Sequence, residues 1–225
     1  MDISVIDDTP LFAGIDPLER AELLAGATVT HLSRGEVLFR QGDSGDTFYI
    51  VVVGKMKLGR QAADGRETLI AVLGPGEMIG ELTLFDPGPR TATAVAIADA
   101  ELSALSHYQL SRWIETHPTL ATHLLSALAR RLRRTNEILG DLVFHDVPGR
   151  MARAILDLSQ RFGSPADRGT YVRHDLTQEE LAQLVGASRE TVNKALSGFA
   201  QRGWIRLDGR ALTVLDPERL QRRAR

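Results

Sequence analysis

The chain has 225 residues, of which 43% are hydrophobic and 25% are charged, with a net charge of −2 and no cysteine. This length allows one large or two modest domains with real cores. The lack of cysteine excludes disulfides, thiolate metal sites and cysteine-held iron–sulfur clusters. No apolar run approaches the roughly 18 residues of a membrane span, and the N-terminus, Met1–Ser4, lacks the features of a signal peptide. We therefore expect a cytoplasmic protein without a membrane partner.

A helix is predicted over residues 17–25, and the sequence from about 30 to 106 then has the pattern of an all-β domain. Short apolar runs alternate there with turns that contain glycine. The predicted strands are 36–39, 47–53, 55–58 and 69–73, and the turns fall at Gly35, Gly42, Gly54, Gly65 and 74–76. Many short strands between glycine turns are typical of a small sandwich or jelly roll.

Two motifs late in this β region carry charge, namely Gly80-Glu81-Leu82-Thr83 and Arg90-Thr91-Ala92. An arginine is a natural phosphate partner because its guanidinium is always charged and donates in a fork. A hydroxyl and backbone amides beside it complete an anion cradle, and a glutamate can accept a hydrogen bond from a ribose hydroxyl. The motifs therefore predict a nucleotide site. The alternative is a structural ion pair of Arg90 with Glu81 or Asp86.

A long helix is predicted from about Pro118 to Phe144. Its apolar positions alternate four and three residues apart, and helices with such a heptad pattern twist around one another. The seam residues are Ala121, Leu125, Leu128, Leu132, Thr135, Leu139 and Leu142. This seam predicts a homodimer, although a single helix that lies on its own domain would show a similar pattern. The polar member, Thr135, either finds a buried partner or costs stability.

Proline and glycine mark a boundary and a plausible hinge at residues 146–149. An amphipathic helix is predicted to follow over residues 150–162. The stretch 163–169 is predicted to be an exposed loop.

The segment 177–207 has the pattern of a helix-turn-helix. Thr177 and Glu180 form a capping box, which satisfies two amides at the start of a helix. Gly186 stands where the chain must turn, because glycine adopts the left-handed conformation without steric cost. Ser188 is a good N-cap for the second helix. The two helices and their glycine turn predict a DNA-binding protein.

Arg189 and Glu190 lie in the first turn of the second helix, where recognition helices contact base edges. Arginine pairs with guanine, and a carboxylate accepts from cytosine. The charge distribution agrees with this assignment: residues 151–225 contain 13 basic and 9 acidic side chains, whereas residues 1–110 contain 8 and 16. A basic surplus near the reading helix favours attraction to phosphate.

A hairpin is predicted after the second helix. The runs 204–207 and 212–215 flank Asp208-Gly209, which is a strong turn signal between such runs. The helix-turn-helix is therefore expected to carry a wing, with Arg210 at its tip in reach of phosphate.

Three longer strings carry a family resemblance: Phe-Asp-Pro-Gly-Pro-Arg-Thr at 85–91, Ala-Arg-Arg-Leu-Arg-Arg-Thr-Asn at 129–136, and Gln-Leu-Val-Gly-Ala-Ser-Arg-Glu-Thr-Val-Asn-Lys-Ala-Leu at 183–196. With the order of elements, they make the chain resemble the cyclic-AMP receptor protein family of bacterial transcription regulators, especially its actinobacterial members. The resemblance implies an α+β chain with four parts: a cyclic-nucleotide-binding β-roll (jelly roll) at 1–117, a dimerisation helix at 118–145, a hinge at 146–149 and a winged helix-turn-helix at 150–225.

The resemblance also implies 3′,5′-cyclic AMP as the allosteric ligand, with no metal. Glu81 would take the ribose 2′-hydroxyl, Arg90 and Thr91 the cyclic phosphate, and Thr135 the adenine of its own subunit. Asn136 would contact the adenine of the partner. The complete implied set is Gly65, Gly80, Glu81, Leu82, Thr83, Arg90, Thr91, Thr135 and Asn136. A serine replaces Asn136 in the enterobacterial relative, which leaves discrimination against cyclic GMP open.

The resemblance implies that Arg189 and Glu190 read a palindrome with GTGA-like half-sites, and that Thr177 and Gln178 contact phosphate. The complete set of implied DNA contacts is Thr177, Gln178, Ser188, Arg189, Glu190, Asn193, Lys194 and Arg210. RNA polymerase is an expected further partner, with activation or repression set by the position of the site.

The main alternative is the same DNA-binding fold with a different ligand, a weakly coupled ligand or none. An enzyme is not expected, because no nucleophile–base motif is present. The six histidines show no metal-ligand spacing, so no metal is predicted.

Overall fold

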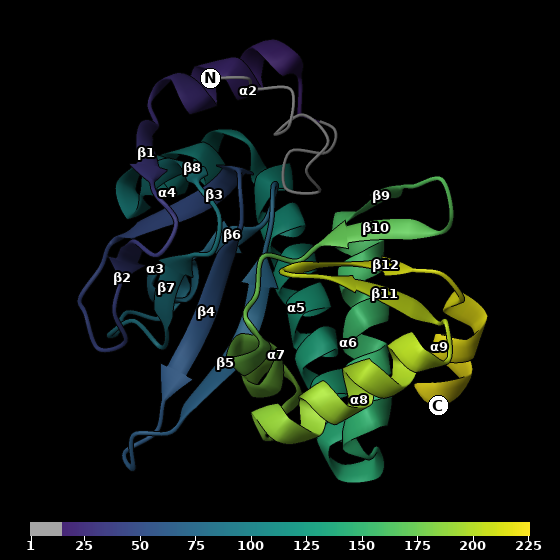
Figure 1. Cartoon of the computed structure of the whole chain (residues 1–225). Coiled ribbons are helices and arrows are strands. Elements are labelled where there is room, and N and C mark those ends of the chain that lie inside the picture. Colours follow the sequence, from purple (N-terminus) through teal and green to yellow (C-terminus); the bar gives the residue numbers. More distant parts are fainter. Residues whose placement is uncertain (1–14) are drawn as a thin grey trace. The chain divides into compact units, whose positions relative to one another are not determined.

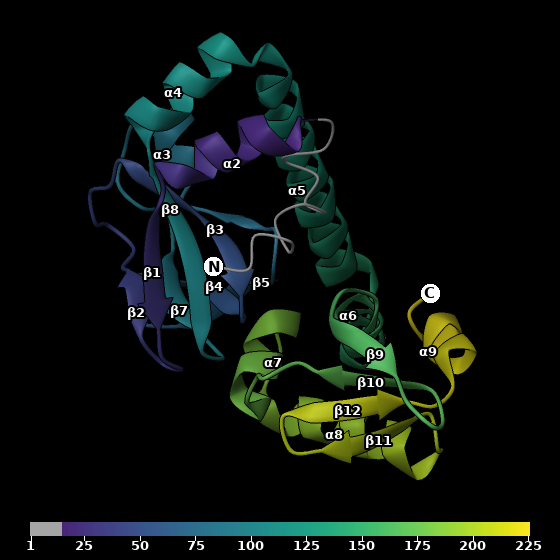
Figure 2. The same ribbon diagram turned by 90° about the horizontal axis from the view of Figure 1, so that it is seen from above.

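The computed structural model describes residues 15–225. The chain divides into two compact units between Arg134 and Thr135, at a point inside one long helix. Figures 1 and 2 show that the N-terminal unit is built around β-strands, whereas helices dominate the C-terminal unit.

The N-terminal unit contains two four-stranded antiparallel sheets, with strand orders β1-β8-β3-β6 and β2-β7-β4-β5. Its elements are α2 Pro17–Ala25, β1 Thr28–Leu32, β2 Val37–Phe39, β3 Thr47–Val53, β4 Met56–Gln61, β5 Glu67–Leu73, β6 Met78–Ile79, α3 Leu82–Phe85, β7 Thr93–Ala96, β8 Ala100–Ser106, α4 His107–Thr116 and the start of α5 Pro118–Phe144. The predicted β-roll is confirmed.

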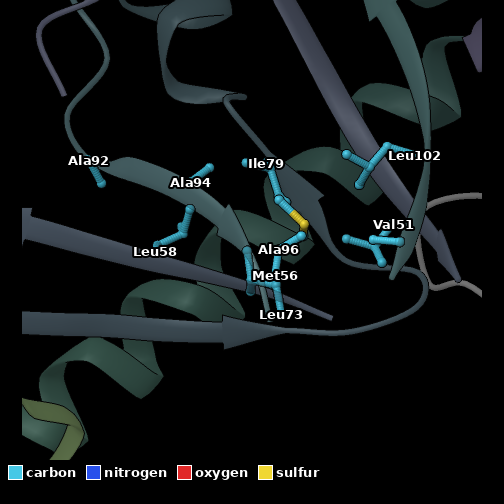
Figure 3. Packing of buried hydrophobic residues seen from close by; sticks show 10 residues of the cluster. Val51, Met56, Leu58, Leu73, Ile79, Ala92, Ala94, Ala96 and Leu102 are labelled. Carbon is cyan, nitrogen blue, oxygen red and sulfur yellow. The ribbon is translucent and has the colours of Figure 1, made fainter. Parts of the chain in front are cut away.

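One hydrophobic core lies between the two sheets (Figure 3). Val51, Ile79 and Leu102 of one sheet pack with Met56, Leu58, Leu73, Ala94 and Ala96 of the other. Each fully buried aliphatic side chain contributes about 1.5–3 kcal/mol. The paired sheets therefore hold the segments that carry the predicted nucleotide motifs.

A second core covers the opposite face of β3. Phe48, Ile50 and Val52 pack there against α2, α4 and the first turns of α5, where Leu120 and Leu124 are buried. Because β3 is covered on both faces, its apolar run shows no alternation with polar residues.

The predicted helices at 17–25 and 118–144 agree with α2 and α5, and each of the four predicted strands overlaps an observed one. Helices α3 and α4 were not predicted. For α4 the signal was present, because Ser106 and Gln109 form a capping box at its start.

The C-terminal unit combines a helical core with one four-stranded sheet of order β11-β12-β10-β9 (Figure 2). After the end of α5, its elements are α6 Val147–Phe162, β9 Gly163–Pro165, β10 Thr170–Arg173, α7 Gln178–Val185, α8 Arg189–Gln201, β11 Ile205–Asp208, β12 Ala211–Val214 and α9 Pro217–Arg223. Met151 and Ile155 of α6 are fully buried. The predicted winged helix-turn-helix is confirmed.

Two local predictions differ from the structure. Helix α6 begins at Val147 rather than at residue 150, because Asp146 accepts the Gly149 N–H at 3.0 Å and a proline fits a first helical turn. The predicted hinge thus forms mostly the first turn of α6, and a hinge role there stays a prediction. The predicted loop at 163–169 is only partly a loop, because residues 163–165 pair with β10 as an edge strand.

Candidate nucleotide site and DNA-binding surface

Arg90 is a buried cation of the N-terminal unit, with 4% of its surface exposed. Its Nη1 donates to the Gly80 carbonyl at 2.9 Å and to Thr83 Oγ1 at 3.0 Å, and its Nη2 donates to the Thr47 carbonyl at 2.6 Å. Its Nε is buried and has no hydrogen-bond partner among the described residues. One donor of the guanidinium fork is therefore available to an acceptor that the protein does not supply.

The surroundings of Arg90 make its charge costly. Desolvation lowers the pKa of Arg90, while the charges of Tyr49, Asp46, Glu81 and Asp43 act in the opposite direction. The guanidinium also lies over the Phe39 ring, 4.4 Å from its centroid. A buried cation of this kind is stabilised by an anion.

Glu81 is the buried anion of the same site and is 1% exposed. Its Oε1 accepts a hydrogen bond of 2.6 Å from Arg131 Nη1 of α5. Its Oε2 is buried without a partner in the described part of the chain. A buried acceptor without a donor costs free energy, so this oxygen is also suited to a group from outside the protein.

The alternative of a structural ion pair is not what the structure shows for Arg90. Its hydrogen bonds go to two carbonyls and a hydroxyl, and Glu81 pairs with Arg131 instead. Arg131 was not among the predicted site residues, although its hydrogen bond to Glu81 places it in the site.

Arg90 and Glu81 border a small cavity of about 30 Å³. It is lined by Phe39, Leu58, Gly80, Glu81, Leu82, Thr83, Arg90, Thr91, Ala92 and Arg131. Ligand pockets usually measure about 300–1,000 Å³. A nucleotide can therefore enter only if lining side chains such as Arg90 and Arg131 move.

Two glycines make room for the guanidinium. A Cβ at Gly80, where φ is 82°, would lie 2.3 Å from Arg90 Nη1, and a Cβ at Gly45 would lie 2.4 Å from Arg90 Nη2. Gly45 was not among the predicted site residues. Gly65, which was, lies in the β4–β5 turn and is not among the residues that line the cavity.

Thr135 and Asn136 are both exposed on α5, and Thr135 follows Arg131 by one helical turn. Their contacts with adenine stay predictions.

The predicted seam forms an exposed apolar stripe on α5. Leu125, Leu132 and Leu139 are 66%, 62% and 56% exposed. Leu142 lies beside the helix-turn-helix, because a Cβ at Gly186 would come within 3.0 Å of Leu142 Cδ2. Leucines this exposed are typical of a surface that a partner covers.

The helix-turn-helix is formed by the local signals that the sequence contains. Thr177 caps α7 in a reciprocal box with Glu180, and Gly186 adopts φ 61° and ψ 51°. Ser188 caps α8 by accepting the Thr191 N–H at 3.2 Å. The capped helices present the first turn of α8 at the surface.

Most of the predicted DNA-contacting side chains are exposed. Gln178, Ser188, Arg189, Glu190, Lys194 and Arg210 lie at the surface. The Thr177 hydroxyl is already used in the capping box. Asn193 is half-buried, and its Oδ1 is buried without a partner within residues 15–225. A base contact from Asn193 stays a prediction.

The start of α6 is bonded to the helix-turn-helix and to the C-terminus. Arg150 donates to the carbonyls of Val185 at 2.8 Å and Gly186 at 3.2 Å. Arg153 pairs with Asp141 near the end of α5 and donates to the Ala224 carbonyl at 2.7 Å. None of these links was predicted from the sequence.

Among residues 15–225, no three histidine, aspartate or glutamate side chains form a group that could hold a metal ion. No helix within the same range is long and apolar enough to cross a bilayer.

Both units match known domain families. Residues 29–117 match the cyclic nucleotide-binding domain, and residues 149–223 match the Crp-like helix-turn-helix domain. A CRP-like cAMP-activated global transcriptional regulator of Mycobacterium tuberculosis is 51% identical over 215 residues, which cover 96% of each chain. The chain belongs to the CRP family of transcription regulators. Members of this family are regulators rather than enzymes, in agreement with the sequence prediction.

Two further proteins resemble this CRP-family chain at lower sequence identity. The cyclic AMP receptor protein of Thermus thermophilus is 39% identical over 199 residues, which cover 88% of this chain and 89% of that one. The solved structure of the c-di-GMP responsive regulator CLP of Xanthomonas campestris matches with a TM-score of 0.75 and 28% identity, over 88% of this chain and 99% of CLP. The names of these two similar proteins specify different cyclic nucleotides.

Proposed function

We propose that this CRP-family chain is a homodimeric, cyclic-AMP-responsive regulator that binds palindromic promoter DNA with GTGA-like half-sites. The observation that carries the ligand assignment is the buried pair of unsatisfied groups, Arg90 Nε and Glu81 Oε2. A cyclic phosphate needs a donor and a ribose needs an acceptor for its 2′-hydroxyl. These two groups supply both inside a cyclic nucleotide-binding domain.

In this proposal Arg90 holds the cyclic phosphate together with Thr91, and Glu81 holds the ribose. Charge-assisted hydrogen bonds of this kind are stronger than neutral ones. Arg131 already neutralises Glu81, so it either shares the carboxylate with the ribose or moves aside. Thr135 and Asn136 contact the adenine, Asn136 from the partner subunit.

The dimer forms along the exposed stripe of α5, with Leu125 and Leu132 among its members. Burial of these leucines against a second copy removes apolar surface from water, at about 25 cal/mol per Å². A two-fold dimer would present two copies of α8 to successive major grooves about 34 Å apart. Arg189 and Glu190 read base edges there.

The ligand acts by favouring the dimer geometry that binds DNA. Such coupling is typically about 1–3 kcal/mol, and it is reciprocal, so that DNA also tightens cyclic AMP binding. Bound at promoters in the cytoplasm, the protein would recruit or block RNA polymerase according to the position of the site.

Two measurements on the full chain test the proposal. Titration calorimetry with cyclic AMP should show one site per subunit, and Arg90→Ala should remove the binding. Gel shifts with a GTGA palindrome should tighten about 5- to 150-fold when cyclic AMP is added. Identical gel-shift curves with and without cyclic AMP would reject the ligand switch but leave the DNA assignment intact.

A second candidate is the same DNA-binding protein with another nucleotide ligand. The likeness to a c-di-GMP responsive regulator favours its inclusion. Parallel calorimetry with cyclic AMP, cyclic GMP and c-di-GMP decides between the candidates, and the ligand of highest affinity should also be the one that shifts DNA binding.

A further inference from the structure

Asp175 joins the wing tip to the start of the first helix of the helix-turn-helix. It lies between β10 and α7, two residues before the N-cap Thr177. Its backbone N–H donates to the Arg210 carbonyl at 3.0 Å. Arg210 and Gly209 form the two-residue turn between β11 and β12, because Asp208 pairs with Ala211. Figure 1 shows this turn beside the segment that leads from β10 into α7.

The backbone of Asp175 is held in a conformation that side chains disfavour. Its φ is 61°, and no other residue except glycine has a positive φ within residues 15–225. Aspartate tolerates this left-handed conformation better than most residues, but glycine would adopt it more easily. Such a residue persists only where its surroundings fix it, and it is often found at functional sites.

The side chain of Asp175 gives a reason for aspartate at this position. The residue is 2% exposed, and its Oδ1 accepts a hydrogen bond of 3.0 Å from Arg173 Nε on β10. Arg173 itself is largely exposed, with 70% of its side chain accessible. Glycine could form the turn but could not form this link to β10. The carboxylate therefore links Asp175 to β10, the strand that pairs with β12 of the wing.

We propose that Asp175 is a positioning residue for DNA binding, which holds the wing-tip residue Arg210 at a fixed distance from the start of α7. The proposal rests on the DNA binding proposed above, together with the phosphate contacts that the sequence predicts for Arg210 and Thr177. Two phosphate contacts from separate elements form together at the lowest cost when the spacing of those elements is set before binding. A loose wing tip would have to be ordered in the complex, which weakens binding.

A direct electrostatic role predicts the opposite sign. Removal of a carboxylate near DNA should tighten binding if charge alone matters, because each negative side chain repels phosphate. Loss of the positioning effect should weaken binding instead. Asp208→Asn provides the matched control. It removes an exposed carboxylate from the β11–β12 hairpin, near Arg210, and leaves the hydrogen bond between Asp175 and Arg210 in place.

The experiment measures the affinity of the full-length protein for a labelled GTGA palindrome, with cyclic AMP present, over a series of salt concentrations. Arg210→Ala should weaken binding and lower the salt slope by about 1 per subunit, as for any lost phosphate contact. Asp175→Ala should weaken binding about 5- to 10-fold and lower the slope by the same amount. The double variant should have the same DNA affinity as Arg210→Ala alone, because both substitutions remove the same phosphate contact, that of Arg210.

Further variants keep the test decisive if Asp175→Ala folds poorly. Asp175→Gly relieves the backbone and still removes the carboxylate, so it should weaken binding in the same direction. Asp175→Asn keeps the acceptor oxygen and should restore affinity to within about 2-fold. Asp208→Asn should bind at least as tightly as the unmodified protein.

Several outcomes overturn the inference: tighter or unchanged binding by Asp175→Gly, additive effects in the double variant, or a silent Arg210→Ala. In each of these cases the unmodified protein still binds the palindrome. If the unmodified protein fails to bind it, the proposed function itself is wrong, so the two failures are distinguishable.

Discussion

The two predicted binding sites treat their charged side chains in opposite ways. In the N-terminal unit Arg90 and Glu81 are almost completely buried, and each keeps one unsatisfied atom. In the C-terminal unit Arg189, Glu190 and Lys194 are exposed on α8. A small ligand is held by enclosing it in a region of low dielectric, where each hydrogen bond is strong. A DNA duplex is too large to enclose, so the side chains that contact it must be exposed on the protein surface.

The long helix α5 belongs to both units, and the largest expected effect is on its seam. Leu132→Glu should place two carboxylates in the proposed dimer interface, at a cost of several kcal/mol. Sedimentation should then show a monomer, with loss of DNA affinity. Arg133→Glu, on the adjacent exposed position, should leave the dimer intact. A dimeric Leu132→Glu protein would mean that the stripe is not the interface.

The next largest effect tests the enclosed charge. Arg90→Ala should weaken cyclic AMP binding by about 3 kcal/mol, because a single hydrogen bond to a charged group contributes up to about 3 kcal/mol. Calorimetry measures this loss. Arg90→Lys should recover only part of it, since lysine keeps the charge but lacks the fork. Equal affinities of Arg90→Ala and the unmodified protein would remove Arg90 from the site.

The protruding charges should show a smaller and more specific effect. Arg189→Ala should cost about 1–3 kcal/mol in DNA affinity and relax the preference at one base of each half-site. Binding to a panel of singly substituted palindromes checks both. Arg202→Ala, at the other end of α8, should leave the sequence preference unchanged. A base preference that survives Arg189→Ala would contradict the recognition assignment.

The smallest effect concerns the C-terminal helix. Arg223 hydrogen-bonds Asp146, and this bond, with a further one from the Gly149 N–H, lowers the pKa of Asp146. Because its pKa is lowered in the folded protein, the Asp146 carboxylate stabilises the fold at pH values above the pKa of the unfolded group, which is about 4. That contribution is lost as the pH falls through the folded value. It should stay below about 1 kcal/mol, because the pair is largely exposed.

Arg223→Ala should therefore raise the pKa of Asp146 toward its ordinary value in an NMR titration. Its destabilisation should be present at neutral pH and disappear in acid. Arg222→Ala, which removes a pair with Glu218 on the same helix, should leave the titration of Asp146 unchanged. A destabilisation by Arg223→Ala that persists in acid would place the role of Arg223 elsewhere.

Local signals in the sequence were sufficient for much of the fold. The capping box at Thr177, the left-handed Gly186 and the heptad spacing on α5 each depend on residues only a few positions apart. Predictions failed where local signals conflicted with pairing. Residues 163–165 were expected to be a loop because they contain glycine and proline, yet β10 recruits them as an edge strand.

The sequence by itself determined the order of the domains, the helix-turn-helix and the presence of Glu81 and Arg90 in one short region. Tertiary structure alone decided the partners of those charges. Arg90 donates to the carbonyl of Thr47, and Glu81 accepts from Arg131, 43 and 50 residues away. Asp175 likewise bonds Arg210. Helix caps and glycine turns follow from short-range sterics, whereas the partner of a buried charge depends on which distant segments the packed cores bring together.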